Sequence, residues 1–306
     1  MRNINSCKKL YGILLSIFCH LLFFCGIFTI KYLYQNDKMG YFEVMYFRCA
    51  FSFLSIEIIS HFIHAPIFSI DRSLIFSLIL RWTSASIGMV FGFLGMKYNN
   101  LTINSVINCT YPIYCIIFSK IFLKDYIPFL YLILIMISLL GALIISISKS
   151  VGNNPNESKF GWIFPILAGI SSSVGDIIQR KMGSKLNSIV MAHYIPIFIS
   201  LLIGILAILS KQNINFSRSY NNICVIIRLL IPGVVIGIGT IIYSKAMTYE
   251  NPAIIAVVGY SQLIFSILSD ILVFGFENNF LEMIGSILII SGGIGISLSK
   301  IYHESN

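Results

Sequence analysis

Apolar runs of about twenty residues alternate with short polar breaks along almost the whole chain. The hydrocarbon core of a bilayer is about 30 Å thick, so one membrane-spanning helix needs roughly 20 apolar residues. Cutting the sequence at its polar breaks predicts about ten such helices, at residues 10–30, 41–60, 74–96, 102–122, 127–147, 161–178, 188–208, 223–246, 253–274 and 280–298. The pattern therefore predicts an all-α integral membrane protein.

The joints between these runs are short, so neighbouring helices should form antiparallel hairpins. A polar linker at 148–160 divides the chain near its middle. Shifting the sequence by 149 places Gly26 on Gly175, and shifting it by 151 superposes Gly88 on Gly239, Tyr98 on Tyr249, Asn100 on Asn251 and Gly141 on Gly292. We therefore predict two five-helix repeats, at 10–147 and 161–298. Because five is odd, the second repeat must be inverted relative to the first, as in many transporters.

Composition excludes an ordinary soluble domain, because 57% of the 306 residues are hydrophobic and only 11% are charged. The formal net charge of +9 comes from basic residues scattered between apolar runs, which predicts no nucleic-acid partner. More of these residues, Arg81 among them, lie on the side of both chain ends than on the other side. By the positive-inside rule this excess favours both termini in the cytoplasm. The membrane that we expect is the plasma (inner) membrane.

Each half contains a polar break followed by small and polar residues, at 95–114 (GMKYNNLTINSVINCTYPIY) and at 244–270 (SKAMTYENPAIIAVVGYSQLIFSILSD). These stretches resemble the EamA-type module of the drug/metabolite transporter superfamily, although Asn104, Asn108 and Cys109 depart from its Ala-rich fourth helix. The resemblance implies a central cavity lined by the first four helices of each repeat. It also implies that the chain is a secondary transporter of a small metabolite, such as an amino acid or a nucleotide derivative, working by alternating access.

Ionisable residues inside a bilayer are costly, so they usually face a partner or a wet cavity. Arg48 lies near the middle of the second predicted helix. Its planar guanidinium could anchor a carboxylate or phosphate of the substrate. The alternative is a pair with Asp176 or Asp270 that locks two helices together.

Asp176 and Gln179 are three residues apart in the sixth predicted helix, so they share one face. They follow a run of small residues that permits close helix contact. Asp176 is predicted either to couple transport to a proton or to contact a substrate amine, with a purely packing role as the alternative.

Asn104, Asn108 and Tyr111 form a polar stripe on the fourth predicted helix, with spacings of four and three residues. Such a stripe is expensive in lipid, so it should face protein or a cavity. The ninth helix offers Tyr260 and Gln262. The predicted substrate-binding set is therefore Arg48, Asn104, Asn108, Tyr111, Asp176, Gln179, Tyr260 and Gln262. The GxxxG pairs Gly88/Gly92 and Gly233/Gly237 predict close helix contacts.

Other kinds of site lack a signature in the sequence. No GxxxxGK[ST] phosphate loop occurs, so we predict neither direct ATP-driven transport nor a cofactor. The histidines and cysteines show no metal-binding spacing, so we predict no metal site. We also predict no catalytic residues and no enzymatic activity. A membrane-embedded enzyme is the alternative from another functional class.

A narrower alternative lies within the same superfamily. The abundance of Ile, Phe, Asn, Lys and Tyr fits an AT-rich genome, as in many intracellular bacteria. The superfamily includes S-adenosylmethionine carriers of such organisms, so an importer or exchanger of that compound is a second hypothesis. The expected partners are a small-molecule substrate, the lipid bilayer, and either a coupling proton or a counter-substrate. A homodimer is left open.

Overall fold

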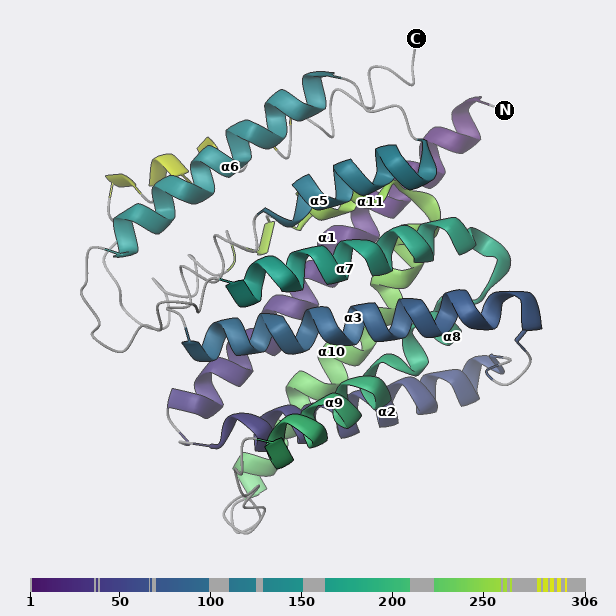
Figure 1. The fold of residues 1–306 in the computed structure, drawn as a ribbon, viewed down its shortest axis with the longest axis vertical. Helices are drawn as coiled ribbons and strands as arrows, with labels where there is room; N and C mark the ends of the chain where they lie inside the picture. Colours follow the sequence, from purple (N-terminus) through teal and green to yellow (C-terminus); the bar gives the residue numbers. More distant parts are fainter. Residues whose placement is uncertain are drawn as a thin grey trace.

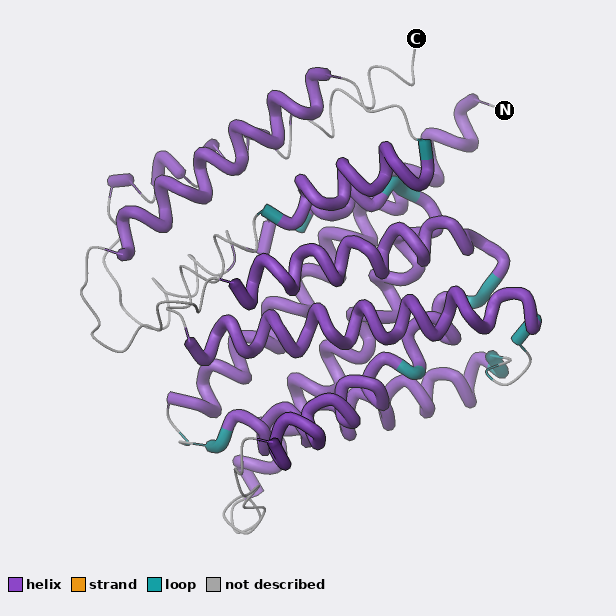
Figure 2. The backbone as a smooth tube through the Cα atoms, viewed as in Figure 1, coloured by secondary structure: helices purple, strands orange, loops and turns teal. Residues whose placement is uncertain are grey.

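The computed structural model describes residues 2–35, 37, 39–65, 67, 70–98, 110–124, 129–150, 163–209, 223–259, 261–262, 265, 280–281, 283–285, 287–288, 291–292 and 295. In these ranges every regular element is a helix (Figures 1 and 2). The described elements are α1 (Arg2–Gln35), α2 (Tyr41–Ile63), α3 (Arg72–Tyr98), α5 (Tyr111–Phe118) with a π-helical turn (Ser119–Leu123), α6 (Phe129–Ser150), α7 (Ile163–Met182) with a short 3-10 turn (Gly183–Lys185), α8 (Ser188–His193), α9 (Ile195–Leu209), α10 (Ile223–Tyr249) and α11 (Pro252–Val258).

Nine of the ten predicted spans overlap a described element, whereas the tenth, 280–298, falls where only isolated residues are described. One of the nine differs in detail. The seventh predicted span, 188–208, is two helices, α8 and α9, separated at Tyr194. Pro196 is the second residue of α9. Proline has no N–H to donate to the preceding turn but suits the first turn of a helix, so it explains why the helix restarts there.

Four helices in the described ranges are long and apolar enough to cross a membrane, at Leu10–Ile30, Arg72–Gly95, Ser188–Leu209 and Ile223–Tyr249. Two shorter apolar helices lie at Tyr111–Leu123 and Phe129–Gly141. The helices α2 and α7 have similar lengths, but charged residues such as Arg48 and Asp176 lower their hydropathy. These lengths and compositions support an integral membrane protein.

The distribution of side chains is the reverse of that in a soluble protein. Phe62, Phe76 and Ile208 are each more than three quarters exposed. Ser86 and Ser173 are completely buried. An apolar outside and a polar inside suit a protein surrounded by lipid, in which costly polar groups are covered by other helices.

Two antiparallel helix pairs run through the bundle. On α1, Gly12 lies against Tyr249 and Gly26 lies against Ile236, so α1 and α10 run in opposite directions. The helices α3 and α7 are likewise antiparallel, because Gly88 contacts Ser172 whereas Gly175 lies beside Ser84 (Figure 1). Small residues at these contacts allow the backbones to approach closely.

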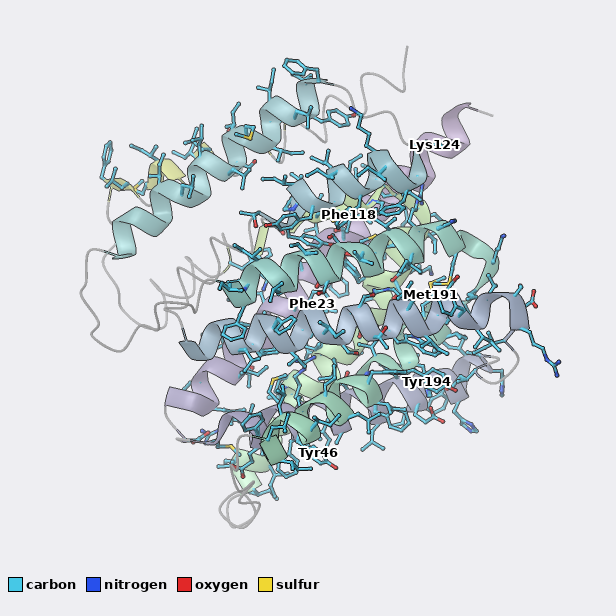
Figure 3. The ribbon with its side chains drawn as sticks, viewed as in Figure 1. Phe23, Tyr46, Phe118, Lys124, Met191 and Tyr194 are labelled. Carbon is cyan, nitrogen blue, oxygen red and sulfur yellow. The ribbon has the colours of Figure 1, made fainter. Side chains whose placement is uncertain are left out.

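Two parallel contacts join these pairs to α2 and α9. Gly233 and Gly237 of α10 lie against Phe51 and Ser55 of α2, respectively, so α2 and α10 run in the same direction. Trp82 and Ser86 of α3 donate to the carbonyl oxygens of Met191 in α8 and Ile195 in α9, respectively, so α3 runs parallel to α8 and α9. Figure 3 labels Met191 and Tyr194 on this segment.

The largest apolar core lies where α2, α3, α9 and α10 meet. It includes Met45, Leu78, Phe93, Ile199 and Ile236. The helix α6 lies at one edge of the bundle, away from this core (Figure 1). Its exposed side includes Phe129, Met136 and Leu140, which suits contact with lipid.

Candidate functional site

A cluster of polar side chains is buried where α3, α5, α7 and α10 meet. Its centre is Asp176 of α7, which is 3% exposed. Arg81 Nη2 lies 3.4 Å from Asp176 Oδ1. Two tyrosines donate their hydroxyls to Oδ2: Tyr243 at 2.7 Å, and Tyr111. The two phenolic oxygens are themselves 3.1 Å apart. Each carboxylate oxygen of Asp176 therefore has a partner, as a charge inside a membrane protein requires.

Gln179 extends the cluster by one helical turn. Its Oε1 accepts a hydrogen bond from Arg81 Nε at 2.7 Å, and its Nε2 donates to the carbonyl oxygen of Ser244 at 3.0 Å. The three-residue spacing places Asp176 and Gln179 on the same face of α7, as predicted. Together they bind two nitrogens of one guanidinium, which fixes its orientation.

A glycine makes room for that guanidinium. A Cβ atom on Gly175 would lie 2.8 Å from Arg81 Nη1 and 3.0 Å from Ser84 Oγ. Any larger residue at this position would push α3 and α7 apart or displace Arg81. The small residues that precede Asp176 thus have a local reason, because they let the charged pair form between closely packed helices.

Arg180, next to Gln179, binds the end of α10. Its Nη1 donates to the carbonyl oxygens of Met247 and Thr248, at 3.0 and 2.9 Å. The last carbonyls of a helix lack intrahelical partners and carry partial negative charge. Arg180 therefore ties the end of α7 to the end of α10 beside the cluster.

His20 of α1 covers the cluster from another side. Its ring packs edge-on against Tyr243, with a centroid separation of 6.0 Å, and its Nδ1 lies 2.7 Å from the carbonyl oxygen of Ser16. The side chain is 8% exposed. The position of Tyr243 is thus set by α1 as well as by its own helix.

The assignment of Arg81 to a polar joint is corrected by the structure. This residue is 4% exposed and lies within α3, where it pairs with Asp176. The sequence around a single arginine near the end of an apolar run is the same whether its side chain reaches water or binds a buried acid. The acid that distinguishes the two cases is Asp176, which lies in the other half of the chain, one helical turn before Gln179, itself 98 residues from Arg81.

Three of the predicted site residues, Tyr111, Asp176 and Gln179, come together in this cluster. Arg48 lies elsewhere, against Met45, Met89 and Phe93. Within the described ranges the cation paired with Asp176 is Arg81, so the proposed lock between Arg48 and Asp176 does not form.

The remaining predictions for the site concern the fourth and ninth helices. Asn104, Asn108 and Tyr260 lie outside the described residues, as does Asp270. Gln262 lies just beyond α11, where its backbone N–H donates to the carbonyl oxygen of Gly259 at 3.0 Å. In the described part of the chain, no group of three or more His, Cys, Asp or Glu side chains has the geometry of a metal site.

The chain is similar to a known family in sequence and to solved structures in fold. The profile of the EamA-like transporter family matches residues 159–298. Among solved structures 29 chains match; one, described only as "Crystal structure of protein", has a TM-score of 0.78 at 12% identity and covers 94% of this chain and 96% of its own. At that identity the likeness shows a shared fold. No curated protein matches. The match of residues 159–298 to this family confirms the resemblance to the drug/metabolite transporter superfamily and indicates a membrane transporter.

Proposed function

We propose that this protein is a secondary transporter that carries a small metabolite across the plasma (inner) membrane by alternating access between two inverted five-helix halves. The family match supports transport, and the apolar helices support the membrane. The proposed halves are residues 10–147 and 161–298. Their proposed orientation has both termini in the cytoplasm.

The directions of the helices support inversion. The helix α1 is antiparallel to α10, and α10 is parallel to α2. The helix α3 is antiparallel to α7 and parallel to α9. Contacts of Glu57 with His193 and of Cys49 with Ser200 make α2 antiparallel to α9. It follows that α1, α2 and α3 run opposite to α7, α9 and α10, their counterparts in the second half.

The glycines superposed by the sequence shifts make exchanged contacts. Gly26 of α1 packs on Ile236 of α10, whereas its counterpart Gly175 of α7 packs on α3. Gly88 of α3 packs on α7, whereas its counterpart Gly239 of α10 packs on Phe23 of α1. An exchange of partners of this kind is what a twofold axis between two repeats produces.

One observation carries the functional proposal: the polar cluster joins the two halves. Arg81 and Tyr111 come from the first half, and Asp176, Gln179 and Tyr243 come from the second. Burying charged side chains inside a membrane protein costs free energy. Such residues therefore usually mark substrate or proton pathways. We propose Asp176 as the carboxylate for proton coupling. The proposed substrate-binding set remains Arg48, Asn104, Asn108, Tyr111, Asp176, Gln179, Tyr260 and Gln262.

The decisive experiment is uptake by purified protein in lipid vesicles. A panel of radiolabelled metabolites, including amino acids, nucleotide derivatives and S-adenosylmethionine, is tested with and without a pH gradient. Uptake stimulated by the gradient would support proton coupling, and counterflow without a gradient would support exchange. Chemical conversion instead of accumulation would support the membrane-embedded enzyme, and neither accumulation nor conversion of any compound would refute the transporter.

A pair of conservative variants tests whether the cluster takes part. Tyr111→Phe and Tyr243→Phe each remove one hydroxyl donor from Asp176 and leave the ring in place. We expect each to slow uptake by about tenfold, which corresponds to one charged hydrogen bond. Tyr46→Phe on the exposed side of α2 is the matched control and should transport as the wild type does. Normal uptake by the double variant Tyr111→Phe/Tyr243→Phe would remove the cluster from the mechanism.

A further inference from the structure

Arg48 is a buried cation that makes no ion pair with any described residue. It lies on α2 seven residues after Tyr41, about 10 Å along the helix, and its side chain is covered so that the residue is 2% exposed. Its Nη1 and Nη2 lie 3.9 and 3.3 Å from the sulfur atoms of Met45 and Met89, respectively. Its Cζ lies 5.0 Å from the centre of the Phe93 ring. Its Nε has no hydrogen-bond acceptor among the described residues.

These contacts do not replace the water that a guanidinium loses on burial. Thioether sulfur is a weak acceptor, and a guanidinium presents five N–H donors and stays charged in a protein. The Phe93 ring offers a cation–π contact, which is weaker than an ion pair. Burying an ion costs more free energy than such a contact returns. A full partner for Arg48 is therefore missing from this environment.

The other buried arginine of the described core has its anion. Arg81 faces Asp176 and Gln179. Arg228, which is partly exposed, binds both carboxylate oxygens of Asp37 at 2.8 Å. No acidic side chain of the described ranges lies within ion-pair distance of Arg48. Arg81 thus has a carboxylate partner in Asp176, whereas Arg48 has none among the described residues.

The surroundings of Arg48 suit an anion that comes and goes. Its neighbours Met45, Met89 and Phe93 are apolar, so they exclude water and strengthen any charge interaction made there. Methionine is flexible and polarisable, so Met89 can leave the guanidinium when a better acceptor arrives. Met89 lies eight residues beyond Arg81 on α3, about 12 Å along the helix, so the two arginines occupy separate positions in the bundle.

We propose that Arg48 binds an oxyanion of the transported compound, so that the substrate carries a carboxylate or a phosphate group. The planar fork of the guanidinium matches either group in a bidentate way. This inference rests on the transporter function proposed above and adds the chemical class of the substrate. It makes Arg48 a residue that determines specificity.

The first test measures stability without substrate. Arg48→Gln removes an unpaired buried charge, so the melting temperature of the purified full-length protein in detergent should stay the same or rise. Arg81→Gln, which strands Asp176, should lower it. A fall for Arg48→Gln comparable with that for Arg81→Gln would mean that Arg48 has a carboxylate partner in the protein, such as Asp270, and would overturn the proposal.

The second test measures substrate choice in vesicles. We expect carboxylates or phosphate esters among the panel compounds to be transported, and their methyl esters or dephosphorylated forms to compete at least tenfold less well. Arg48→Gln should raise KM for the anionic compound by about ten- to a hundredfold, the equivalent of one or two charge-assisted hydrogen bonds. Arg48→Lys should recover part of this loss, and Arg72→Gln at the exposed start of α3 should have no effect.

Competition by methyl esters tests recognition of a carboxylate, and competition by dephosphorylated forms tests recognition of a phosphate. The outcomes also separate the role proposed for Arg48 from the proposed transporter function. Accumulation of only uncharged or cationic compounds, with the same KM in Arg48→Gln, would refute the role of Arg48 and leave the transporter intact. An unchanged preference for the anion in Arg48→Gln would refute it as well. Failure of the wild type to accumulate any compound would instead refute the transporter.

Discussion

Asp176 illustrates how a carboxylate is kept inside this helix bundle. Its partners come from three other helices: Arg81 from α3, Tyr111 from α5 and Tyr243 from α10. Hydrogen bonds to a charged acceptor are about twice as strong as those between neutral groups. Loss of one partner would leave the other charge buried without compensation, which costs more than the pair itself contributes.

Asp176→Asn should therefore destabilise the protein by about 3–5 kcal/mol, because it strands the Arg81 guanidinium. Thermal unfolding in detergent measures this. Asp37→Asn makes the same chemical change in the pair with Arg228, in which the aspartate side chain is 16% and the arginine side chain 31% exposed. Solvent screens that pair more than it screens Asp176, so its loss should cost less. The double variant Arg81→Gln/Asp176→Asn should recover much of the stability; equal effects of Asp176→Asn and Asp37→Asn would contradict this view of the cluster.

Within this cluster the sequence predicts Asp176 and Gln179 as site residues, but it does not identify Arg81 as their partner. Asp176 and Gln179 are conspicuous because they interrupt an apolar run at helical spacing. Arg81 has the same residue type and sequence neighbourhood as an arginine that reaches the membrane surface. Only the packing of α3 on α7 separates the two cases, and that packing joins residues about a hundred positions apart.

At the scale of helices, contacts of glycine decide which elements pack closely. A Cβ on Gly233 would lie 2.4 Å from Phe51 Cβ and 2.9 Å from the Arg48 carbonyl oxygen. A Cβ on Gly237 would lie 2.3 Å from Ser55 Oγ. The predicted close contact of this GxxxG pair is thus confirmed. In the other pair only Gly88 is tightly packed, since a Cβ on Gly92 would meet Ala168 at an ordinary 3.9 Å.

Alanine substitutions should separate these glycines. Gly233→Ala places a methyl group against the backbone of α2, and overpacking of this kind costs about 1–3 kcal/mol. Gly204→Ala, where nothing lies within 4 Å, should be neutral or stabilising by up to about 1 kcal/mol because alanine favours the helix. Melting temperatures in detergent compare the two. If Gly204→Ala proves as harmful as Gly233→Ala, close packing of α2 on α10 is not the reason for the glycine.

The lengths of the helices can be predicted from the sequence because bilayer thickness fixes them. Breaks within a predicted span, and which helix packs on which, cannot be predicted in this way. The break between α8 and α9 is visible only as Pro196, which elsewhere is tolerated within a helix, as Pro232 is in α10. Lipid tails are as apolar as leucine, so hydropathy cannot say which helix packs on which. The superposed glycines, such as Gly88 and Gly239, and the GxxxG pair Gly233/Gly237 do carry a signal for partners, because they lie where helices touch.

The whole molecule allows a test of orientation that does not depend on any single contact. The helix directions place residue 64, after α2, on the side where α1 begins, and residue 37 on the other side. With five crossings in the first half, residue 155 must lie on the side of residue 37. A fluorescent reporter that matures only in the cytoplasm should therefore glow when fused after residue 64 and stay dark after residues 37 and 155. A periplasmic phosphatase should give the reverse pattern. The first two fusions calibrate the assay within the same chain; if they behave as expected but the fusion at 155 glows, the first half crosses the membrane an even number of times, and the two halves cannot be inverted copies.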